Sequence, residues 1–187
     1  MYIYKRGVIH GRFQLLHNDH LKYILAGKRL AKHLFIGITN PDPNYTKTDE
    51  ADPHRSAPDS NPFTYYERYE MVKEALLHEG LSPRDFSIVP LPINFPALYH
   101  YYCPKDAVYF LTIYDEWGMK KLRTFKELGL QTYVLWKRPK EKKGLSATMV
   151  RQLLEEGTGW EQLVPPPVRD VVMRFHLRER LLQKSCG

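Results

Sequence analysis

Cysteine and long apolar runs are scarce in this sequence. Cys103 and Cys186 are the only cysteines among 187 residues, which argues against a disulfide framework or a cysteine-based zinc site and suits a reducing compartment. No stretch approaches the roughly 20 consecutive apolar residues that a membrane-spanning helix needs. The first residues, MYIYKRGVIHGRF, show neither the apolar core nor the cleavage site of a secretory signal. We therefore expect a cytoplasmic protein without a membrane partner.

Acidic residues are also fewer than basic ones. The chain has 28 Lys and Arg against 21 Asp and Glu, a formal net charge of +7. Such an excess favours anionic partners: nucleic acid, an acidic membrane surface or phosphorylated small molecules. The densest basic run, residues 137–143, is short and contains Glu141, which is typical of a solvated loop. No nucleic-acid-binding motif is recognisable, so we expect small phosphorylated substrates and no nucleic acid.

Short apolar segments alternate with helical patterns along the whole chain. The apolar segments predict strands at residues 7–9, 34–38, 86–89, 108–111 and 132–135. Helices are predicted at residues 21–30, 117–128, 147–156 and 168–182, and another from Thr64, where Thr64 and Glu67 form a capping box. This alternation predicts one α/β domain over residues 1–187, with a doubly wound, mostly parallel sheet and C-terminal helices. Such sheets bind ligands at the carboxyl ends of their strands.

One polar segment interrupts this alternation. Residues 40–62 carry five prolines and show no helical or strand periodicity. A loop of this length in a small domain is usually functional or disordered. Two interpretations stay open: a mobile lid over a binding site, or an insertion without function.

The most informative motif runs from Gly11 to His20, directly after the first predicted strand. Gly11 lets the backbone approach a phosphate closely, and Arg12 offers a planar guanidinium suited to phosphate oxygens. His17 and His20, three residues apart at a helix start, share one face beside free backbone amides. These parts predict a triphosphate site. The alternatives are two ordinary histidines, or a zinc pair, which lacks both the metalloprotease spacing and a third ligand nearby.

A second motif opens a late helix. Ser146 is a natural N-cap, and Thr148 with the local amides could bind phosphate oxygens. Arg151 lies on the first turn, where it could reach the same anion. Helix capping alone would also explain Ser146, so this motif by itself is weak.

Taken together, the two motifs resemble signatures of one enzyme superfamily. The segment from Gly11 to His20 resembles GRFQPxHxGH, and the segment from Leu145 to Arg151 resembles ISxTxxR, both typical of the Rossmann-like nucleotidyltransferases. Longer segments are similar to the archaeal type of nicotinamide-nucleotide adenylyltransferase. Residues 61–68 resemble its NPFTxxER, residues 160–165 its WEDLVP, and residues 90–95 fall near its IPLPDINF.

This resemblance implies in-line transfer of AMP from Mg-ATP to nicotinamide or nicotinic acid mononucleotide, forming NAD or its acid analogue. His17 and His20 would hold the ATP phosphates, while Arg12 and Arg151 would neutralise the charge that develops on the oxygens. Mg²⁺ would bridge the phosphates largely through water, so no protein metal ligands are expected. Relatives of this type often assemble, which favours a homo-oligomer. The other positions expected to border the substrates are Gly11, Phe13, Gln14, Gly37, Thr39, Asn94, Tyr99, Ser146 and Thr148.

The match is weaker on the acceptor side. Pro96 and Tyr99 replace an Asn and a Trp of the family; Tyr99 could stack on nicotinamide, and Asn94 could bond its carboxamide. Leu15 replaces a proline, and Asp19 replaces a glycine at the helix start. For Asp19 we expect outward-facing helix capping, with a magnesium contact as the alternative. The same chemistry on another phosphorylated acceptor, with another nucleotide donor, therefore stays open.

Overall fold

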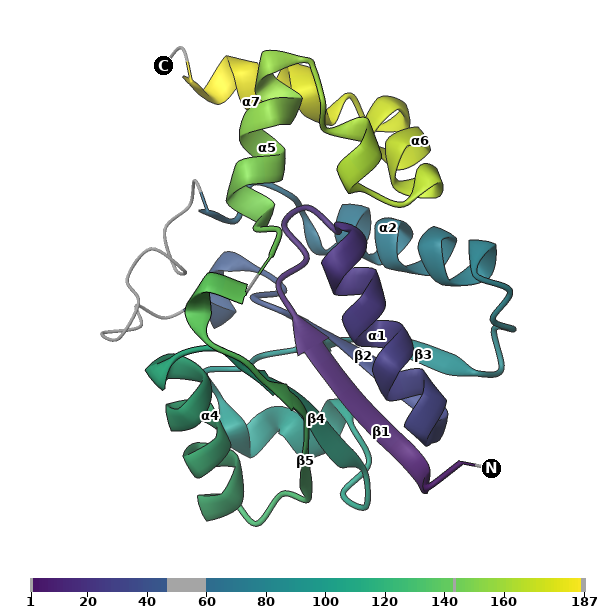
Figure 1. Ribbon diagram of the computed structural model, residues 1–187, viewed down its shortest axis with the longest axis vertical. Coiled ribbons are helices and arrows are strands. Elements are labelled where there is room, and N and C mark those ends of the chain that lie inside the picture. Colours follow the sequence, from purple (N-terminus) through teal and green to yellow (C-terminus); the bar gives the residue numbers. More distant parts are fainter. Residues whose placement is uncertain (1, 47–59, 143, 186–187) are drawn as a thin grey trace.

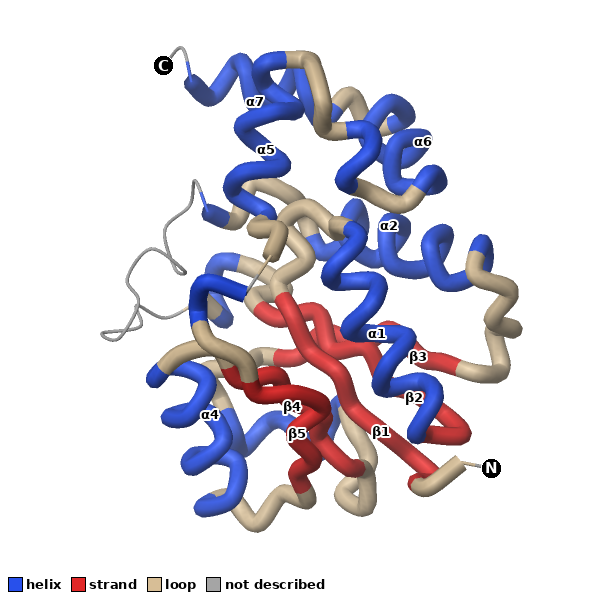
Figure 2. Tube along the Cα trace, viewed as in Figure 1, coloured by secondary structure: helices blue, strands red, loops and turns tan. Residues whose placement is uncertain are grey.

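Five parallel strands form the centre of the protein. The computed structural model describes residues 2–46, 60–142 and 144–185, and its sheet has the strand order β3-β2-β1-β4-β5 (Figure 2). At the middle of the sheet, Gly7 pairs with Leu34 on one side and with Val108 on the other. The predicted doubly wound parallel sheet is thereby confirmed. The strands are β1 (Tyr4–Gly11), β2 (Ala31–Thr39), β3 (Phe86–Leu91), β4 (Val108–Ile113) and β5 (Thr132–Lys137).

Helices cover both faces of this sheet and create two apolar cores. Ile9 of β1 packs in the larger core with Ile24 and Met71, whereas Val8 packs in the smaller core with Phe125. This alternation follows from the period of two in a strand, which sends successive side chains to opposite faces. The helices over the larger core are α1 (Asn18–Leu30) and α2 (Tyr65–His78), and those over the smaller core are α3 (Tyr99–Tyr102) and α4 (Glu116–Glu127).

Three C-terminal helices lie beyond the carboxyl end of β1 (Figure 1). They are α5 (Ala147–Glu156), α6 (Pro166–Arg174) and α7 (Leu177–Ser185). The prediction of one continuous helix over residues 168–182 is wrong, because the chain turns at Phe175 and at His176, which has a left-handed φ of 50°. The turn lets Arg178 donate to the carbonyls of Leu154 and Glu155, which fastens α7 to α5.

Ion pairs also join these last helices to the main body. Arg180 of α7 donates to both carboxylate oxygens of Glu67, at 2.5 and 2.7 Å. Arg174 of α6 bonds to Glu70 at 3.0 Å. Glu67 closes the predicted capping box with Thr64 as well. The start of α2 is therefore fixed from two directions.

Short 3₁₀ turns complete the connections. They are η1 (Pro43–Tyr45), η4 (Pro96–Leu98), η5 (Lys140–Lys142) and η6 (Glu161–Leu163). The lid interpretation of residues 40–62 falls largely on residues 47–59, which lie outside the described residues. Across the described ranges, no helix combines the length and apolar character that a membrane span requires.

Candidate active site

A cavity of about 530 Å³ opens at the carboxyl end of the sheet. Both motifs contribute to its wall. Six of the residues predicted from the first motif line it: Gly11, Arg12, Phe13, Gln14, His17 and His20. Five further predicted residues line it as well: Thr39, Asn94, Tyr99, Ser146 and Thr148. Gly37 and Arg151 do not lie among the described residues of this wall.

The two histidines of the first motif form a stacked pair at the start of α1. Their ring centroids are 3.6 Å apart and their planes differ by 18°. His17 is the N-cap of α1, and its Nδ1 accepts the backbone N–H of His20 at 3.4 Å. A neutral imidazole that accepts at Nδ1 carries its proton on Nε2. His17 therefore has one N–H left to donate to a ligand in the cavity.

Burial keeps both rings neutral near pH 7. It lowers the pKa of His17 to about 4, against an opposing effect of the Asp19 carboxylate. The pKa of His20 is lowered well below its usual value, first by burial and then by the proximity of His17. Two neutral imidazoles can donate hydrogen bonds to phosphate oxygens without repelling each other as cations.

Phe13 supports this pair from behind. Its ring meets His20 edge-on at 5.2 Å between centroids. Its backbone has a φ of 52°, which brings the ring against Gly11, where an added Cβ would lie 2.8 Å from Cε1 of Phe13. Glycine at position 11 is thus required by the Phe13 ring, besides leaving backbone exposed to a ligand.

Gln14 is held from two sides. Its side chain donates to the carbonyl of Phe63 at 3.0 Å and accepts the Phe63 N–H at 2.9 Å. Its own backbone carbonyl accepts a hydrogen bond from Nη1 of Arg151. Arg151 is buried, and burial lowers the pKa of its guanidinium. We call residues 12–17, between β1 and α1, the first-motif loop. Arg151 bonds to the backbone of this loop and thereby positions it.

Arg68 is the main residue that sequence reasoning missed. Its side chain is 1% exposed and donates to four backbone carbonyls: those of Thr64 at 3.1 Å, Arg12 at 2.9 Å, Thr39 at 2.7 Å and Asn40 at 2.8 Å. Burial lowers its pKa to about 10, so it stays a cation near pH 7. It ties the first-motif loop to the end of β2 and to the start of α2.

Asp19 connects the two motifs. The expectation of outward-facing capping is wrong, because His17 is the N-cap and Oδ2 of Asp19 accepts the N–H of Leu145 at 2.8 Å. Lys22 pairs with the other carboxylate oxygen at 3.3 Å. Gly144 packs directly on Asp19, since an added Cβ there would clash with Oδ2 of Asp19. The substitution of glycine by Asp19 thus supplies a bond between α1 and the loop before α5.

The second motif presents a helix terminus to the cavity. Ser146 is the N-cap of α5 and accepts the N–H of Met149 at 3.2 Å. Thr148 is exposed on the first turn and lines the cavity. Amides at such a terminus favour anions. Gly37 has a different role from the predicted one: it packs on Leu91, whose Cδ2 would lie 2.8 Å from an added Cβ.

The opposite end of the cavity is built mainly from aromatic rings. Tyr99 is 4% exposed and packs against Tyr109 and Phe125, with centroids 6.3 and 6.0 Å away. Its hydroxyl donates to the carbonyl of Ile93 at 2.5 Å, and burial raises its pKa. The predicted stacking of Tyr99 on a nicotinamide ring has little exposed ring face available.

Several residues that line the cavity at this end were not predicted, among them His10, Tyr114, Trp117 and Lys121. Trp117 and Lys121 belong to α4, and the Lys121 Nζ lies 4.1 Å from the Trp117 ring centroid. His10 precedes Gly11 at the end of β1. Its strand position predicts the face on which it lies, but nothing in the sequence predicts a cavity on that face.

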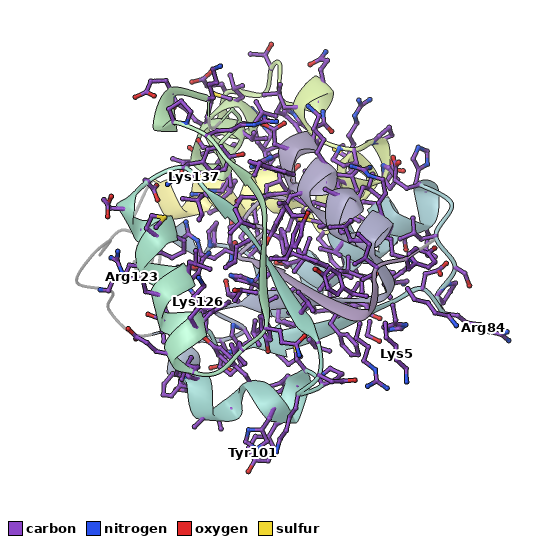
Figure 3. All side chains as sticks on the ribbon, turned by 60° about the horizontal axis from the view of Figure 1, so that its bottom comes forward. Lys5, Arg84, Tyr101, Arg123, Lys126 and Lys137 are labelled. Carbon is purple, nitrogen blue, oxygen red and sulfur yellow. The ribbon has the colours of Figure 1, made fainter. Side chains whose placement is uncertain are left out.

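The excess positive charge is spread over the molecule. Figure 3 shows Lys5 and Arg84 projecting at one edge, and Arg123, Lys126 and Lys137 projecting from or near α4 at another. The cavity itself is lined by three cationic side chains, those of Arg12, Lys120 and Lys121, and by two carboxylates, those of Asp19 and Asp115. This balance favours an anionic ligand.

Comparisons with known proteins show the family of this chain. The cytidylyltransferase-like family model matches residues 8–153. The phosphonoformate cytidylyltransferase of Streptomyces viridochromogenes is 50% identical over 175 residues, which are 94% of each chain. The nicotinamide-nucleotide adenylyltransferase of Thermococcus onnurineus is 32% identical over 179 residues, covering 95% of this chain and 87% of that protein.

A solved structure shows the same fold at low sequence identity. It is the Francisella tularensis bifunctional NMN adenylyltransferase/ADP ribose pyrophosphatase complexed with AMP and a manganese ion, with a TM-score of 0.67 and 16% identity. The match covers 99% of this chain and 53% of that one, so it bears on the fold alone. With the family match spanning both motifs, this chain belongs to the cytidylyltransferase-like family and is a nucleotidyltransferase.

Proposed function

We propose that this enzyme transfers a cytidylyl group from CTP to phosphonoformate, or to a very similar small phosphonate acid, and releases pyrophosphate. The observation that carries the proposal is the 50% identity, over 94% of both chains, to a phosphonoformate cytidylyltransferase. Identity to the nicotinamide-nucleotide adenylyltransferase is 32% over a similar length. A substrate class is more often shared at the higher of these identities.

The acceptor end of the cavity supports a small acid over a nucleotide. Pro96, which starts η4, has no side-chain polar group to bind a carboxamide. Tyr99 uses its hydroxyl on Ile93 and most of its ring on core packing. A phosphonocarboxylate needs hydrogen-bond donors and cations rather than a stacking surface, and Lys121 supplies a cation there.

The reaction follows from the phosphate-binding end. A phosphonate oxygen attacks the α-phosphorus of CTP, the bond from that phosphorus to the bridging oxygen breaks, and pyrophosphate leaves. The phosphonate is already ionised, so positioning and charge stabilisation matter more than a general base. The N–H groups of neutral His17 and His20 would donate to the phosphate oxygens, and Arg12 would offset developing charge. Ser146, Thr148 and the amides of α5 would bind the leaving pyrophosphate.

Magnesium enters this proposal with the nucleotide. Within the described residues, no group of three His, Cys, Asp or Glu side chains could hold a metal ion. The two carboxylates at the cavity, those of Asp19 and Asp115, also accept the backbone amides of Leu145 and Gly118. A cation held mainly by phosphate oxygens and water suits this donor set. When bound, it would screen the triphosphate charge.

Adenylyl transfer to nicotinamide or nicotinic acid mononucleotide is the second candidate. Its support is the motif resemblance together with Asn94, which lines the cavity and could bind a carboxamide or carboxylate. The two candidates share the phosphate-binding residues and differ in the base and the acceptor. They can therefore be separated by substrates alone.

The test is pyrophosphate release in a matrix of CTP or ATP against phosphonoformate, nicotinamide mononucleotide or nicotinic acid mononucleotide. We expect CTP with phosphonoformate to give the highest kcat/KM by at least about tenfold, a difference of about 1.4 kcal/mol in transition-state binding. Preference for ATP with a pyridine mononucleotide would replace the first proposal by the second.

A further inference from the structure

His10 is a buried histidine at the acceptor end of the cavity. It lies near the end of β1, next to Gly11, and is 6% exposed. Because Val8 packs in the smaller core, the period of two places the His10 side chain on that face too. Its ring lies 5.4 Å from that of Phe125, and it lines the cavity.

Neither ring nitrogen of His10 has a hydrogen-bond partner among the residues that the structure describes. Leaving a buried polar atom unsatisfied costs about 1–3 kcal/mol, so such groups are rare and call for an explanation. The contact with Phe125 needs only a flat ring, which a phenylalanine would supply without that cost. The stability of the fold therefore does not explain an imidazole at this position.

The surroundings of His10 favour an anion. Burial lowers the pKa of His10 well below its usual value, and the nearby positive charge of Lys121 lowers it further. The ring is thus neutral, with one N–H to donate and a cation close by. The carboxylate of Asp115, also on the cavity wall, accepts the N–H of Gly118 at 2.9 Å. A ligand group that accepts hydrogen bonds and carries negative charge would satisfy His10 and would lie close to the positive charge of Lys121.

We propose that His10 is a specificity-determining residue that donates a ring N–H to the non-reacting carboxylate of the acceptor, with Lys121 balancing its charge. This inference rests on the proposed transfer to a phosphonocarboxylate. His10 directly precedes the first motif, which holds the triphosphate in that proposal. An acceptor anchored at His10 must therefore be short for its phosphonate to reach the α-phosphorus, as phosphonoformate is. The acceptor class is a small acid with a phosphonate and a carboxylate close together.

The experiment combines a change in the enzyme with a change in the acceptor. Steady-state rates are measured for the wild type and His10→Phe with phosphonoformate and with methylphosphonate, which lacks the carboxylate. We expect His10→Phe to raise the KM for phosphonoformate about 10- to 100-fold, the range for losing a hydrogen bond to a charged group. Its KM for CTP should stay unchanged. With methylphosphonate the variant and the wild type should differ less than about threefold, because the lost bond has no partner there.

Three further variants test whether the effect comes from the hydrogen bond of His10. Tyr109→Phe is the matched control, because it also removes a polar atom beside Phe125. Tyr109 is not among the described residues that line the cavity, so the KM of this variant for phosphonoformate should match that of the wild type. His10→Leu serves as the apolar replacement if a phenyl ring prevents folding, with circular dichroism as the check. His10→Gln, which keeps an amide donor, should fall between the wild type and His10→Phe.

Three outcomes of these measurements would contradict the proposed role of His10. An unchanged KM for phosphonoformate in a folded apolar variant overturns the role of His10 and leaves the proposed reaction intact. An equal loss with phosphonoformate and methylphosphonate also overturns it, because the effect would not involve the carboxylate. Turnover of a pyridine mononucleotide but not of phosphonoformate overturns the proposed reaction and this inference together.

Discussion

The two ends of the cavity are built in different ways. At the proposed nucleotide end, Arg68 and Arg151 come from distant segments and bond to the backbone of the first-motif loop, at Arg12 and Gln14. The Gln14 side chain of that loop bonds in turn to the backbone of Phe63. At the proposed acceptor end, aromatic rings pack around the imidazole of His10, which has no hydrogen-bond partner among the described residues. Hydrogen bonds to the loop backbone fix the position of the phosphate-binding groups, whichever acceptor the enzyme uses. The side chains around His10 can be substituted to suit a different acceptor without moving those groups.

Removing Arg68 should have the largest effect, because it tests whether the nucleotide end depends on one cation. Arg68→Met would remove the four hydrogen bonds that this side chain donates to backbone carbonyls. We expect the free energy of unfolding to fall by about 4 kcal/mol, the upper range for a single substitution. Urea denaturation followed by circular dichroism measures this. The control Arg84→Met, at an exposed edge position (Figure 3), should change the free energy of unfolding by less than about 0.5 kcal/mol. A similar loss in both variants would show that the hydrogen bonds of Arg68 do not hold these segments together.

The buried histidines should make stability depend on pH. The folded-state pKa of His17 is about 4, against a usual value of 6.5, so the unfolded chain takes up a proton first as the pH falls. Stability is therefore complete above about pH 6.5 and declines toward pH 4, by about 3 kcal/mol from this residue alone. His10 and His20, with pKa values lowered by burial, act in the same direction.

This pH dependence is measured by urea denaturation across the interval between about pH 7 and about pH 4. His17→Asn keeps a side chain able to cap α1 but removes one titrating group, so its stability should decline less steeply. Equal slopes for the variant and the wild type would mean that His17 is not held neutral by burial.

His20 lines the cavity at the proposed nucleotide end, and its ring also bonds to the backbone of Leu15. Its Nδ1 is buried without a hydrogen-bond partner in the described part of the chain. His20→Ala should lower kcat about 100-fold or more, as expected for losing a donor to developing charge. The unfolding midpoint should change little. His78→Ala, at the exposed end of α2, is the control, and a near-normal kcat for His20→Ala would refute the assigned role.

How much of this was predictable depends on how local the signal is. The alternation of apolar segments predicts the sheet, and the spacing of His17 and His20 predicts a shared ligand face, because both follow from neighbours in the chain. The role of Arg68 is not predictable in this way, since its partners are backbone carbonyls from three separate segments. Every residue has a backbone carbonyl, so the sequence does not show which carbonyls a buried arginine will bind.

The remaining errors have the same origin. The apolar pattern of the last helices continues through His176, so the turn that separates α6 from α7 is visible only in the backbone angle. Tyr99 was expected to face the ligand, but its hydroxyl bonds to Ile93 and its ring joins the core. Sequence indicates which residue types can do the chemistry; tertiary packing decides which of their atoms stay available.

The smallest expected effect concerns the bond from Leu145 to Asp19, which joins the two motifs on the exposed side. Asp19→Ala would free the N–H of Leu145, so the loop before α5 would be held less firmly over the nucleotide. We expect the KM for the nucleotide to rise about 3- to 10-fold with kcat nearly unchanged, the range for one partly exposed hydrogen bond to a charged group. Lys22→Ala removes only the exposed partner of Asp19 and should leave both constants unchanged. A lower KM in Asp19→Ala would instead show that repulsion between this carboxylate and the triphosphate outweighs the bond to the loop, and that the two motifs do not need this connection.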